Sequence, residues 1–361
     1  MILSCGEALI DMLPRTSTQG EACFAPYTGG AVFNTAIALG RLGAPSAFFS
    51  GVSSDMLGEI LADTLAASQV DTRFLARSDR PTTVAFVKLV NGQASYAFYD
   101  EATAGRMLSP ADLPELPAEV DTLFLGGISL VNDPAASTYE ALQARECLRR
   151  VTMVDPNIRP GFIAGKEADY RARIERMVAR ADIVKLSDED LHWLEGQGDL
   201  TALARGILAR GPKVVFITEG ANGARAVTAT QNIFLAAQKV TVVDTVGAGD
   251  TFNAGVMAAL HREVREETGW TIGEPRWLGA YRRYCYMPDY GFWAEKLCNV
   301  WLARPILLVT YAPERDPGFA FARAMTAAGR LVAIGHADVD FATARGAAAA
   351  GASLSTHLGN G

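Results

Sequence analysis

The sequence predicts an α/β protein in which a largely parallel β-sheet is flanked by helices. Two observations support this prediction. Short β-rich runs alternate with helical stretches from Met1 to about Ala258, and several of these runs end in a polar or glycine-rich turn, which is where parallel sheets carry their functional sites. The predicted strands are Ile2–Leu13, Ser46–Val52, Leu123–Ile128, Val151–Asp155, Ile183–Ser187 and Val214–Thr218.

One early segment departs from this alternation of strand and helix. Two β-rich runs, Thr82–Val90 and Ala94–Tyr99, flank the dipeptide Asn91-Gly92, which is typical of a two-residue hairpin turn. We therefore expect a β-hairpin over about 82–99, and a hairpin inserted into an α/β domain at this point could act as a small lid.

Composition and charge exclude several classes of protein. With 361 residues, 49% of them apolar, the chain can bury a large core, and its length suggests about two domains. The net charge of −7 leaves no basic excess for binding nucleic acid. No run approaches the roughly 18 apolar residues of a membrane span, and the N-terminus does not resemble a secretory signal. The five cysteines are scattered without a Cys-x-x-Cys pair, so we expect reduced thiols in a cytoplasmic protein.

The clearest chemistry lies in Gly247-Ala248-Gly249-Asp250, at the start of a predicted helix. That helix has an apolar stripe of residues spaced four apart, namely Phe252, Val256, Leu260 and Val264. Small residues let the backbone approach a ligand, and the unpaired N–H groups of a first helical turn bind the charge of a transferring phosphoryl group. A carboxylate at this turn can accept the proton of an attacking hydroxyl. These residues predict a small-molecule kinase site, with a ligand-free glycine-rich helix start as the alternative.

Two longer motifs resemble the signatures of the ribokinase (PfkB) family of carbohydrate kinases. Residues 244–255, Asp-Thr-Val-Gly-Ala-Gly-Asp-Thr-Phe-Asn-Ala-Gly, resemble the C-terminal signature, and residues 29–43, which begin Gly-Gly-Ala-Val-Phe-Asn, resemble the N-terminal one. The resemblance implies a ribokinase-like three-layer sandwich with a small β lid. It also implies ATP-dependent phosphorylation of a small-molecule sugar with the help of Mg²⁺, and a homodimer paired through the lid.

The resemblance assigns roles to individual residues around the sugar. Asp250 would deprotonate the sugar hydroxyl, while the amides of Gly247, Ala248 and Gly249 would hold the phosphoryl charge. The substrate would contact residues of the N-terminal signature: Gly29, Gly30 and Asn34. Asp11 closes a segment similar to the first strand of fructokinase-like members and would bind sugar hydroxyls, unless it is a surface aspartate that ends a strand. Arg159 would supply charge-assisted hydrogen bonds to substrate and phosphate, with a surface salt bridge as the alternative.

The resemblance also implies positions for the nucleotide and the metal. The nucleotide-binding residues would be Lys185, Thr218, Gly220 and Gly223, although the two glycines also suit a plain hairpin turn. The family's usual Asn-x-x-Glu magnesium motif is replaced by Ser187-x-x-Asp190. Glu189 and Asp190 keep the hard oxygen ligands that Mg²⁺ prefers, and a helix-capping acidic cluster is the alternative. Neither a P-loop nor a Gly-x-Gly-x-x-Gly fingerprint is present.

The chain changes character after about residue 258. Residues 261–270 resemble the second half of a Nudix box, and its Glu263, Glu266 and Glu267 would equally suit a solvated helix face. Further on, His336 and His357 match metal-binding positions of N-acetylglucosamine-6-phosphate deacetylase, but without a third ligand. We therefore expect a sugar kinase domain over 1–258, a Nudix-like fragment over 259–305 and a deacetylase-like fragment over 306–361, with no fold predicted for this tail.

Three functions stay open at this point. A fructokinase-type carbohydrate kinase is favoured by the two signatures. A sugar-binding protein with impaired catalysis is the first alternative, because the tail lacks the family's last helices, which complete the adenine pocket. A Nudix-type phosphoanhydride hydrolase is the second. The sugar itself cannot be read, since kinases that act on ribose, ketodeoxygluconate or nucleosides share these motifs.

Overall fold

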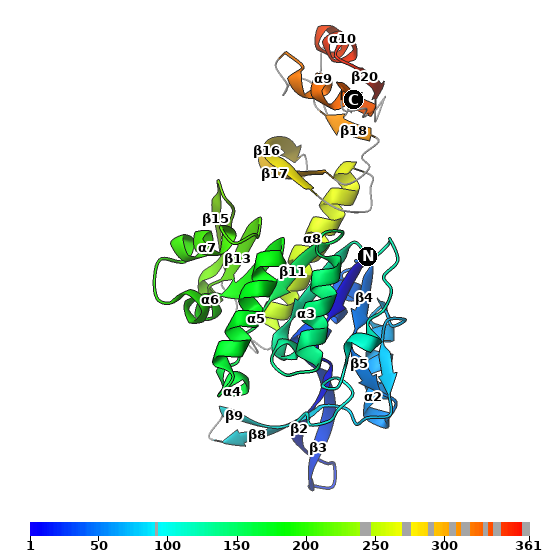
Figure 1. Ribbon diagram of the computed structural model, residues 1–361, viewed down its shortest axis with the longest axis vertical. Coiled ribbons are helices and arrows are strands. Elements are labelled where there is room, and N and C mark those ends of the chain that lie inside the picture. The colour runs from blue at the N-terminus through cyan, green and yellow to red at the C-terminus, as the bar shows by residue number, and fades with distance from the viewer. Residues whose placement is uncertain are drawn as a thin grey trace. The chain divides into compact units, whose positions relative to one another are not determined.

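The computed structural model contains two compact units, Met1–Leu260 and His261–Gly361 (Figure 1). It describes residues 1–90, 93–238, 247–268, 276–287, 292–302, 308–311, 318–327, 331–334 and 341–355. None of the described helices has the length and apolarity that a membrane crossing requires.

The first unit, which we call the N-terminal unit, is built on a nine-stranded sheet of order β15-β14-β13-β12-β11-β10-β1-β4-β6. The strands from β13 to β6 run parallel, and β14 and β15 are antiparallel additions at one edge. The strands are Ile2–Cys5 (β1), Ser46–Phe49 (β4), Val70–Asp71 (β6), Thr122–Gly126 (β10), Val151–Asp155 (β11), Ile183–Ser187 (β12), Val214–Thr218 (β13), Gly223–Val227 (β14) and Asn232–Ala236 (β15). Every residue of the central strands β10 and β11 is buried, as expected for a parallel sheet covered on both faces.

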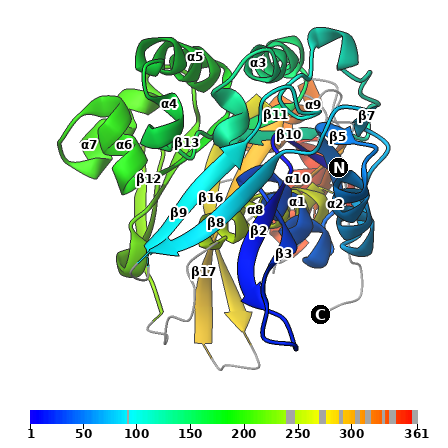
Figure 2. The ribbon, with the colours of Figure 1, turned by 90° about the horizontal axis from the view of Figure 1, so that it is seen from below.

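Helices cover both faces of this sheet (Figures 1 and 2). The helices of the N-terminal unit are Ala31–Arg41 (α1), Met56–Ala67 (α2), Ala135–Glu146 (α3), Pro160–Ile163 (α4), Glu167–Arg180 (α5), Asp188–Glu195 (α6), Leu200–Leu208 (α7) and Ala248–Thr268 (α8), the last of which runs on past Leu260. Helices α3 and α5 pack together on one face, where Gln143 donates to the carbonyl of Met177. Helices α1 and α8 meet on the other, where Thr35 donates to the carbonyl of Asp250. The predicted three-layer α/β arrangement is confirmed for this unit.

A second, four-stranded sheet of order β3-β2-β8-β9 lies below the main sheet in Figure 1, and we call it the lid sheet. Its strands are Leu9–Thr16 (β2), Ala22–Gly29 (β3), Val84–Val90 (β8) and Gln93–Tyr99 (β9). Antiparallel β8 and β9 lie where the hairpin is expected, and the Asn91-Gly92 turn lies outside the described residues. A small parallel pair, Gly51–Ser53 (β5) and Ala76–Ser78 (β7), completes the strands of this unit.

The prediction of one strand over Ile2–Leu13 is wrong. The run divides at Gly6 into β1 of the main sheet and β2 of the lid sheet. Apolar patterning cannot separate one long strand from two short ones that enter different sheets. As a result the lid sheet is twice as large as the hairpin expected from the sequence, and Glu7 lies at the junction of the two sheets.

The apolar stripe of α8 is not the most buried face of this helix. Phe252, Val256 and Leu260 are only half-buried, and the side chain of Val264 lies outside the described residues. The buried face is shifted around the helix and carries Asp250, Asn253, Ala254, Met257 and His261. Polar and small residues occupy this face because it carries the site and packs close to α1, so hydrophobic periodicity selects the neighbouring face.

The second unit contains two separate sheets. Antiparallel β16 (Arg276–Met287) and β17 (Phe292–Leu302) form a long hairpin. Parallel β18 (Leu308–Tyr311), β19 (Leu331–Ile334) and β20 (Ala352–Ser355) form the other, connected through α9 (Ala320–Ala327) and α10 (Phe341–Ala349). The small core around this parallel sheet includes Ala322, Val332 and Ala347.

Candidate active site

The site is built where the parallel strands of the N-terminal unit end. Glu7 follows β1, Asp155 ends β11 and Lys185 lies near the end of β12. Carboxyl ends of neighbouring parallel strands meet at one edge of a sheet, so these side chains converge although they are far apart in the sequence. The N-termini of α1 and α8 bring in the two glycine-rich motifs from one face.

Asp250 is held between α8 and α1. Asn34 Nδ2 donates to Asp250 Oδ2 over 2.9 Å, and Thr35 Oγ1 donates to the Asp250 carbonyl over 3.2 Å. Burial raises the pKa of Asp250 to about 6, the nearby Asp155 carboxylate adds to the rise, and the Asn34 hydrogen bond opposes it. A carboxylate with such a pKa is ionised near neutral pH and still basic enough to take a proton.

Asp155 is the centre of a buried polar cluster. Lys185 Nζ lies 3.1 Å from Asp155 Oδ2, and Asn253 Nδ2 donates to the same oxygen over 2.7 Å. All three side chains are buried. A buried carboxylate requires such partners because an unpaired one is costly to desolvate. The sequence analysis named Asp155 only as the end of a predicted strand and gave Asn253 no role. The position of Asp155 at a strand end and that of Asn253 one turn beyond Asp250 are the signals that could have found them.

The glycine-rich turn lies against Lys185. A Cβ atom added to Gly249 would lie 3.3 Å from Lys185 Nζ, and Gly247 has a left-handed φ of 76°. The backbone N–H groups at the start of α8 and the Lys185 ammonium therefore lie close together. This combination suits an anionic group that carries several oxygens. The preceding residues of the motif, 244–246, lie outside the described residues.

Glu7 is a buried acidic residue beside the site that the sequence analysis did not single out. Its Oε1 accepts hydrogen bonds from the backbone N–H groups of Ala31 (2.9 Å) and Val32 (3.4 Å) at the start of α1, and Oε2 accepts one from Ser129 (3.2 Å). A Cβ on Gly127, where φ is 70°, would clash with this carboxylate. Burial raises the pKa of Glu7 to about 7 despite these donors.

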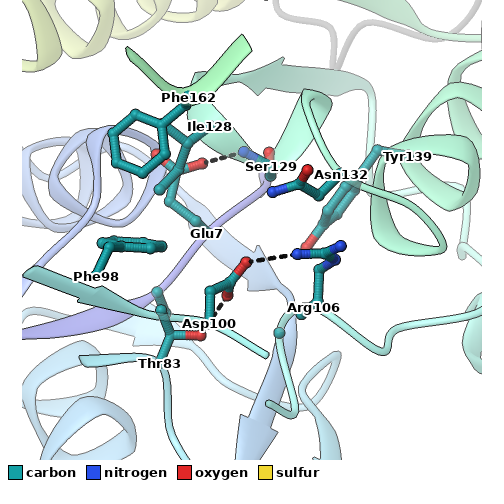
Figure 3. Close-up of a pocket in the computed structure, with 12 residues that line it drawn as sticks. Glu7, Thr83, Phe98, Asp100, Arg106, Ile128, Ser129, Asn132, Tyr139 and Phe162 are labelled. Carbon is teal, nitrogen blue, oxygen red and sulfur yellow. Dashed lines mark hydrogen bonds and ion pairs between the residues drawn. The ribbon is translucent and has the colours of Figure 1, made fainter. Parts of the chain in front are cut away.

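A pocket opens between the lid sheet and the main sheet, as Figure 3 shows. The rings of Phe98 and Phe162 form its apolar side, with centroids 4.9 Å apart in an edge-to-face arrangement. The polar lining includes Glu7, Asp100 and Arg106. No sequence pattern pointed to the pocket, because its lining comes from separate loops and strand ends.

The predicted sugar-binding residues are not among the described lining residues of this pocket. Asp11 faces Gly29 so closely that a Cβ there would lie 2.3 Å from its Oδ2, and burial raises the pKa of Asp11. Gly30, with φ of 108°, precedes α1 and lies against Glu7. Arg159 is exposed, yet its charge lowers the pKa of Asp250, so it lies within electrostatic reach of that carboxylate.

The two predicted metal-binding residues differ in burial and in their contacts. Asp190 is buried and caps α6: its Oδ1 accepts from the Ile158 N–H (3.1 Å) and its Oδ2 from the Ser187 N–H (3.4 Å). Glu189 is exposed. The capping alternative therefore describes the Asp190 contacts, and the role of both residues at a metal stays a prediction. In the part of the chain that the structure describes, no three His, Cys, Asp or Glu side chains form a metal-binding group.

The predicted nucleotide turn joins two antiparallel strands. Thr218 ends β13, and left-handed Gly220 (φ 54°) and Gly223 (φ 137°) shape the turn into β14. A Cβ on Gly223 would lie 2.1 Å from the Leu235 carbonyl of the neighbouring strand β15, so the close packing of β14 against β15 by itself requires this glycine. In the tail, the side chains of the Nudix-like glutamates, together with His336 and His357, lie outside the described residues.

Comparison with known proteins follows the same division of the chain. The chain matches the model of the pfkB family carbohydrate kinases over residues 1–271. A fructokinase from Rhizobium leguminosarum bv. trifolii is 60% identical over 260 residues, which cover 72% of this chain and 79% of that protein. A fructokinase from Klebsiella pneumoniae is 34% identical over 259 residues, 71% of this chain and 82% of that protein.

Solved structures agree with these matches. The structure of fructokinase with bound ATP from Xylella fastidiosa has a TM-score of 0.66 and 28% identity, and the match covers 72% of this chain and 80% of that one. A fructokinase double mutant from Vibrio cholerae O395 with bound fructose, ADP and potassium ion has a TM-score of 0.64 and 29% identity, with 72% and 83% covered.

Proposed function

The chain belongs to the pfkB family of carbohydrate kinases, and from this premise we propose that it transfers the γ-phosphoryl group of ATP to a hydroxyl of fructose. ATP-dependent sugar phosphorylation is the activity of the family, and the relatives named fructokinase suggest the sugar. The observation that carries the proposal is the hydrogen bond between Asn34 and Asp250, because it joins the two signature motifs across 216 positions of sequence.

Asp250 acts as the general base in this proposal. Its carboxylate takes the proton of the sugar hydroxyl while the hydroxyl oxygen forms a bond to the γ-phosphorus and the bond from phosphorus to the ADP oxygen breaks. The amides of Gly247, Ala248 and Gly249 and the Lys185 ammonium lie where they can balance the charge of the transferring group. Asn34 orients the base, and the lid sheet and Arg159 position the substrate.

Mg²⁺ is proposed to enter the site with ATP. The ion neutralises the phosphates when bound. The carbonyl oxygen of the Asn253 side chain is buried without a hydrogen-bond partner among the described atoms. It could accept a hydrogen bond from a water molecule bound to the metal. Glu189 and Asp190 are retained as proposed outer ligands.

The nucleotide is proposed to lie along the turn after β13. Thr218, Gly220 and Gly223 present backbone and hydroxyl groups there, and Lys185 would reach the phosphates from the buried cluster. Glycines that permit close backbone approach are consistent with a phosphate neighbour.

A homodimer through the lid is also proposed. One face of the lid sheet carries an aromatic row in which Phe86 lies 5.1 Å from Phe24 and 5.8 Å from Tyr99, measured between ring centroids. Phe24 is 52% exposed and Tyr99 61% exposed, and a contiguous exposed apolar face suits a protein contact. Sedimentation at micromolar concentration measures the oligomeric state, and a monomer would contradict this proposal. A cytoplasmic location stays a prediction.

The test of the kinase proposal is a comparison of two aspartate variants. Purified protein with fructose, ATP and Mg²⁺ should release ADP, and Asp250→Asn should lower kcat by about 10²- to 10⁴-fold, the usual contribution of a general base. Asp63→Asn, which changes an exposed aspartate on α2, is the matched control and should retain activity. Equal turnover by Asp250→Asn and the control would overturn the mechanism.

The alternatives from the sequence are not favoured. Family match and relatives support a sugar kinase, and neither an inactive sugar-binding protein nor a phosphoanhydride hydrolase has a supporting observation. The Nudix-like and deacetylase-like resemblances of residues 259–361 stay predictions.

A further inference from the structure

One wall of the pocket beneath the lid sheet has charges that the proposed phosphoryl transfer does not use. Asp100 directly follows β9, and Arg106 lies six residues further along the chain. Figure 3 shows the two side chains pointing toward one another, with Asp100 also turned toward Thr83.

The Asp100 carboxylate is held in place by several partners. Arg106 Nη1 lies 3.4 Å from its Oδ2, and its Oδ1 accepts from the hydroxyls of Thr83 (3.0 Å) and Thr103 (3.2 Å). Arg106 is anchored in turn, because its Nε donates to the Asp133 carbonyl over 2.8 Å. The Asp100 side chain is 21% exposed and that of Arg106 is 28% exposed. Both charges are therefore fixed and only partly screened by water.

The charges that line the pocket do not cancel. Among the described lining residues, Glu7 and Asp100 are acidic and Arg106 is the one cation. Asp100 neutralises Arg106, so the Glu7 carboxylate is left without a cationic partner on the lining. Lys166 is not among the described lining residues, and it donates to the side-chain oxygen of Asn132, which is one of them. Above about pH 7, where Glu7 is mostly ionised, an anionic ligand would meet net negative charge here, which is unfavourable in a partly desolvated pocket.

We propose that Asp100 is a specificity-determining residue: by neutralising Arg106 it makes the pocket accept neutral sugars and reject sugars that carry a carboxylate. The other walls agree with a neutral ligand. The rings of Phe98 and Phe162 offer an apolar side for the C–H face of a sugar, while Ser129 and Asn132 offer polar groups for hydroxyls. The inference rests on the proposed function and adds to it that the sugar occupies this pocket, whose lining residue Glu7 lies against Gly30 of the proposed substrate-binding set.

The test unmasks the Arg106 charge. Asparagine at position 100 keeps an oxygen that can accept from Thr83 but loses the negative charge, so Asp100→Asn leaves Arg106 uncompensated. At pH 8, where Glu7 is mostly ionised, the ratio of kcat/KM for ketodeoxygluconate to kcat/KM for fructose should rise about tenfold, as expected for one unpaired charge in a partly exposed pocket. The double variant Asp100→Asn/Arg106→Gln should lose this gain. Glu101→Gln, which changes an exposed neighbour outside the pocket lining, is the matched control and should leave the ratio unchanged.

Calorimetric titration of each ligand without ATP measures the same preference as a ratio of dissociation constants. A shift of this ratio in Asp100→Asn supports the inference even if no phosphorylation is detected, so failure of the kinase proposal and failure of the inference are distinguishable. The inference is overturned if the wild type binds ketodeoxygluconate as tightly as fructose, or if fructose does not bind. It is also overturned if the ratio is unchanged in Asp100→Asn, or shifts equally in Glu101→Gln.

Discussion

Replacing Glu7 by glutamine should change how the stability of the N-terminal unit depends on pH. The Glu7 carboxylate lies at the junction of the main sheet, the lid sheet and α1, and three backbone N–H groups donate to it. Burial nevertheless dominates and raises its pKa from 4.5 to about 7. Glutamine has the same shape, accepts through one oxygen and does not titrate.

The sign follows from linkage. Between pH 4.5 and pH 7 the unfolded chain ionises Glu7 while the folded chain keeps the proton, so stability falls as pH rises through this window. With these two pKa values the loss from Glu7 is about 1 kcal/mol at pH 5 and about 3 kcal/mol at pH 7. The wild type should therefore lose about 2 kcal/mol more than Glu7→Gln between pH 5 and pH 7.

Urea titrations of both proteins at the two pH values measure this difference. Asp250 and Asp182 also have raised pKa values, but they are present in both proteins and their contributions cancel in the comparison. Glu175→Gln, on the exposed side of α5, is the control and should follow the wild type. If the free energies of unfolding of the wild type and Glu7→Gln change equally with pH, Glu7 does not titrate as the burial argument requires.

Two further predictions concern the substrate side of the site. For the wild type, kcat/KM for fructose should fall below about pH 6 as Asp250 protonates. In Asn34→Ala this fall should begin at higher pH, because the hydrogen bond that lowers the pKa of Asp250 is lost. An unchanged pH profile would contradict the role of Asn34. Gly29→Ala should displace the Asp11 carboxylate, since its Cβ would lie 2.3 Å from Oδ2. The KM for fructose should then rise about tenfold or more with the loss of a charge-assisted hydrogen bond, and an unchanged KM would show that Asp11 does not bind the sugar.

Local features of the chain were predictable where a short segment carries its own signal. The strands at Val151–Asp155, Ile183–Ser187 and Val214–Thr218 have the predicted bounds, because a buried parallel strand is a short apolar run bounded by turn residues. The turn Gly247–Asp250 was recognisable for a similar reason. Its glycines and its carboxylate are consecutive in the sequence, so one short segment carries the whole pattern.

Features that depend on two distant segments were not predictable in this way. The apolar pattern of α8 does not reveal its most buried face, because Asp250 and Asn253 on that face are polar. Only their contacts with α1 and β11 explain their burial. Phe98 and Phe162 belong to different elements, and nothing in either segment shows that their rings meet.

The sequence by itself determined the α/β class and the two family motifs, and it pointed to Asp250 as the proposed general base. Only the tertiary structure decided which groups surround that aspartate. Asn34 and Asp155 approach it from other elements, and the burial they share sets its pKa. The same holds for Glu7, whose carboxylate becomes an anchor for α1 only when the chain brings Ser129 and Ala31 to it. The physical reason is common to both: residue type and spacing specify local hydrogen bonding and polarity, whereas burial and charge coupling arise from packing between segments that are remote in sequence.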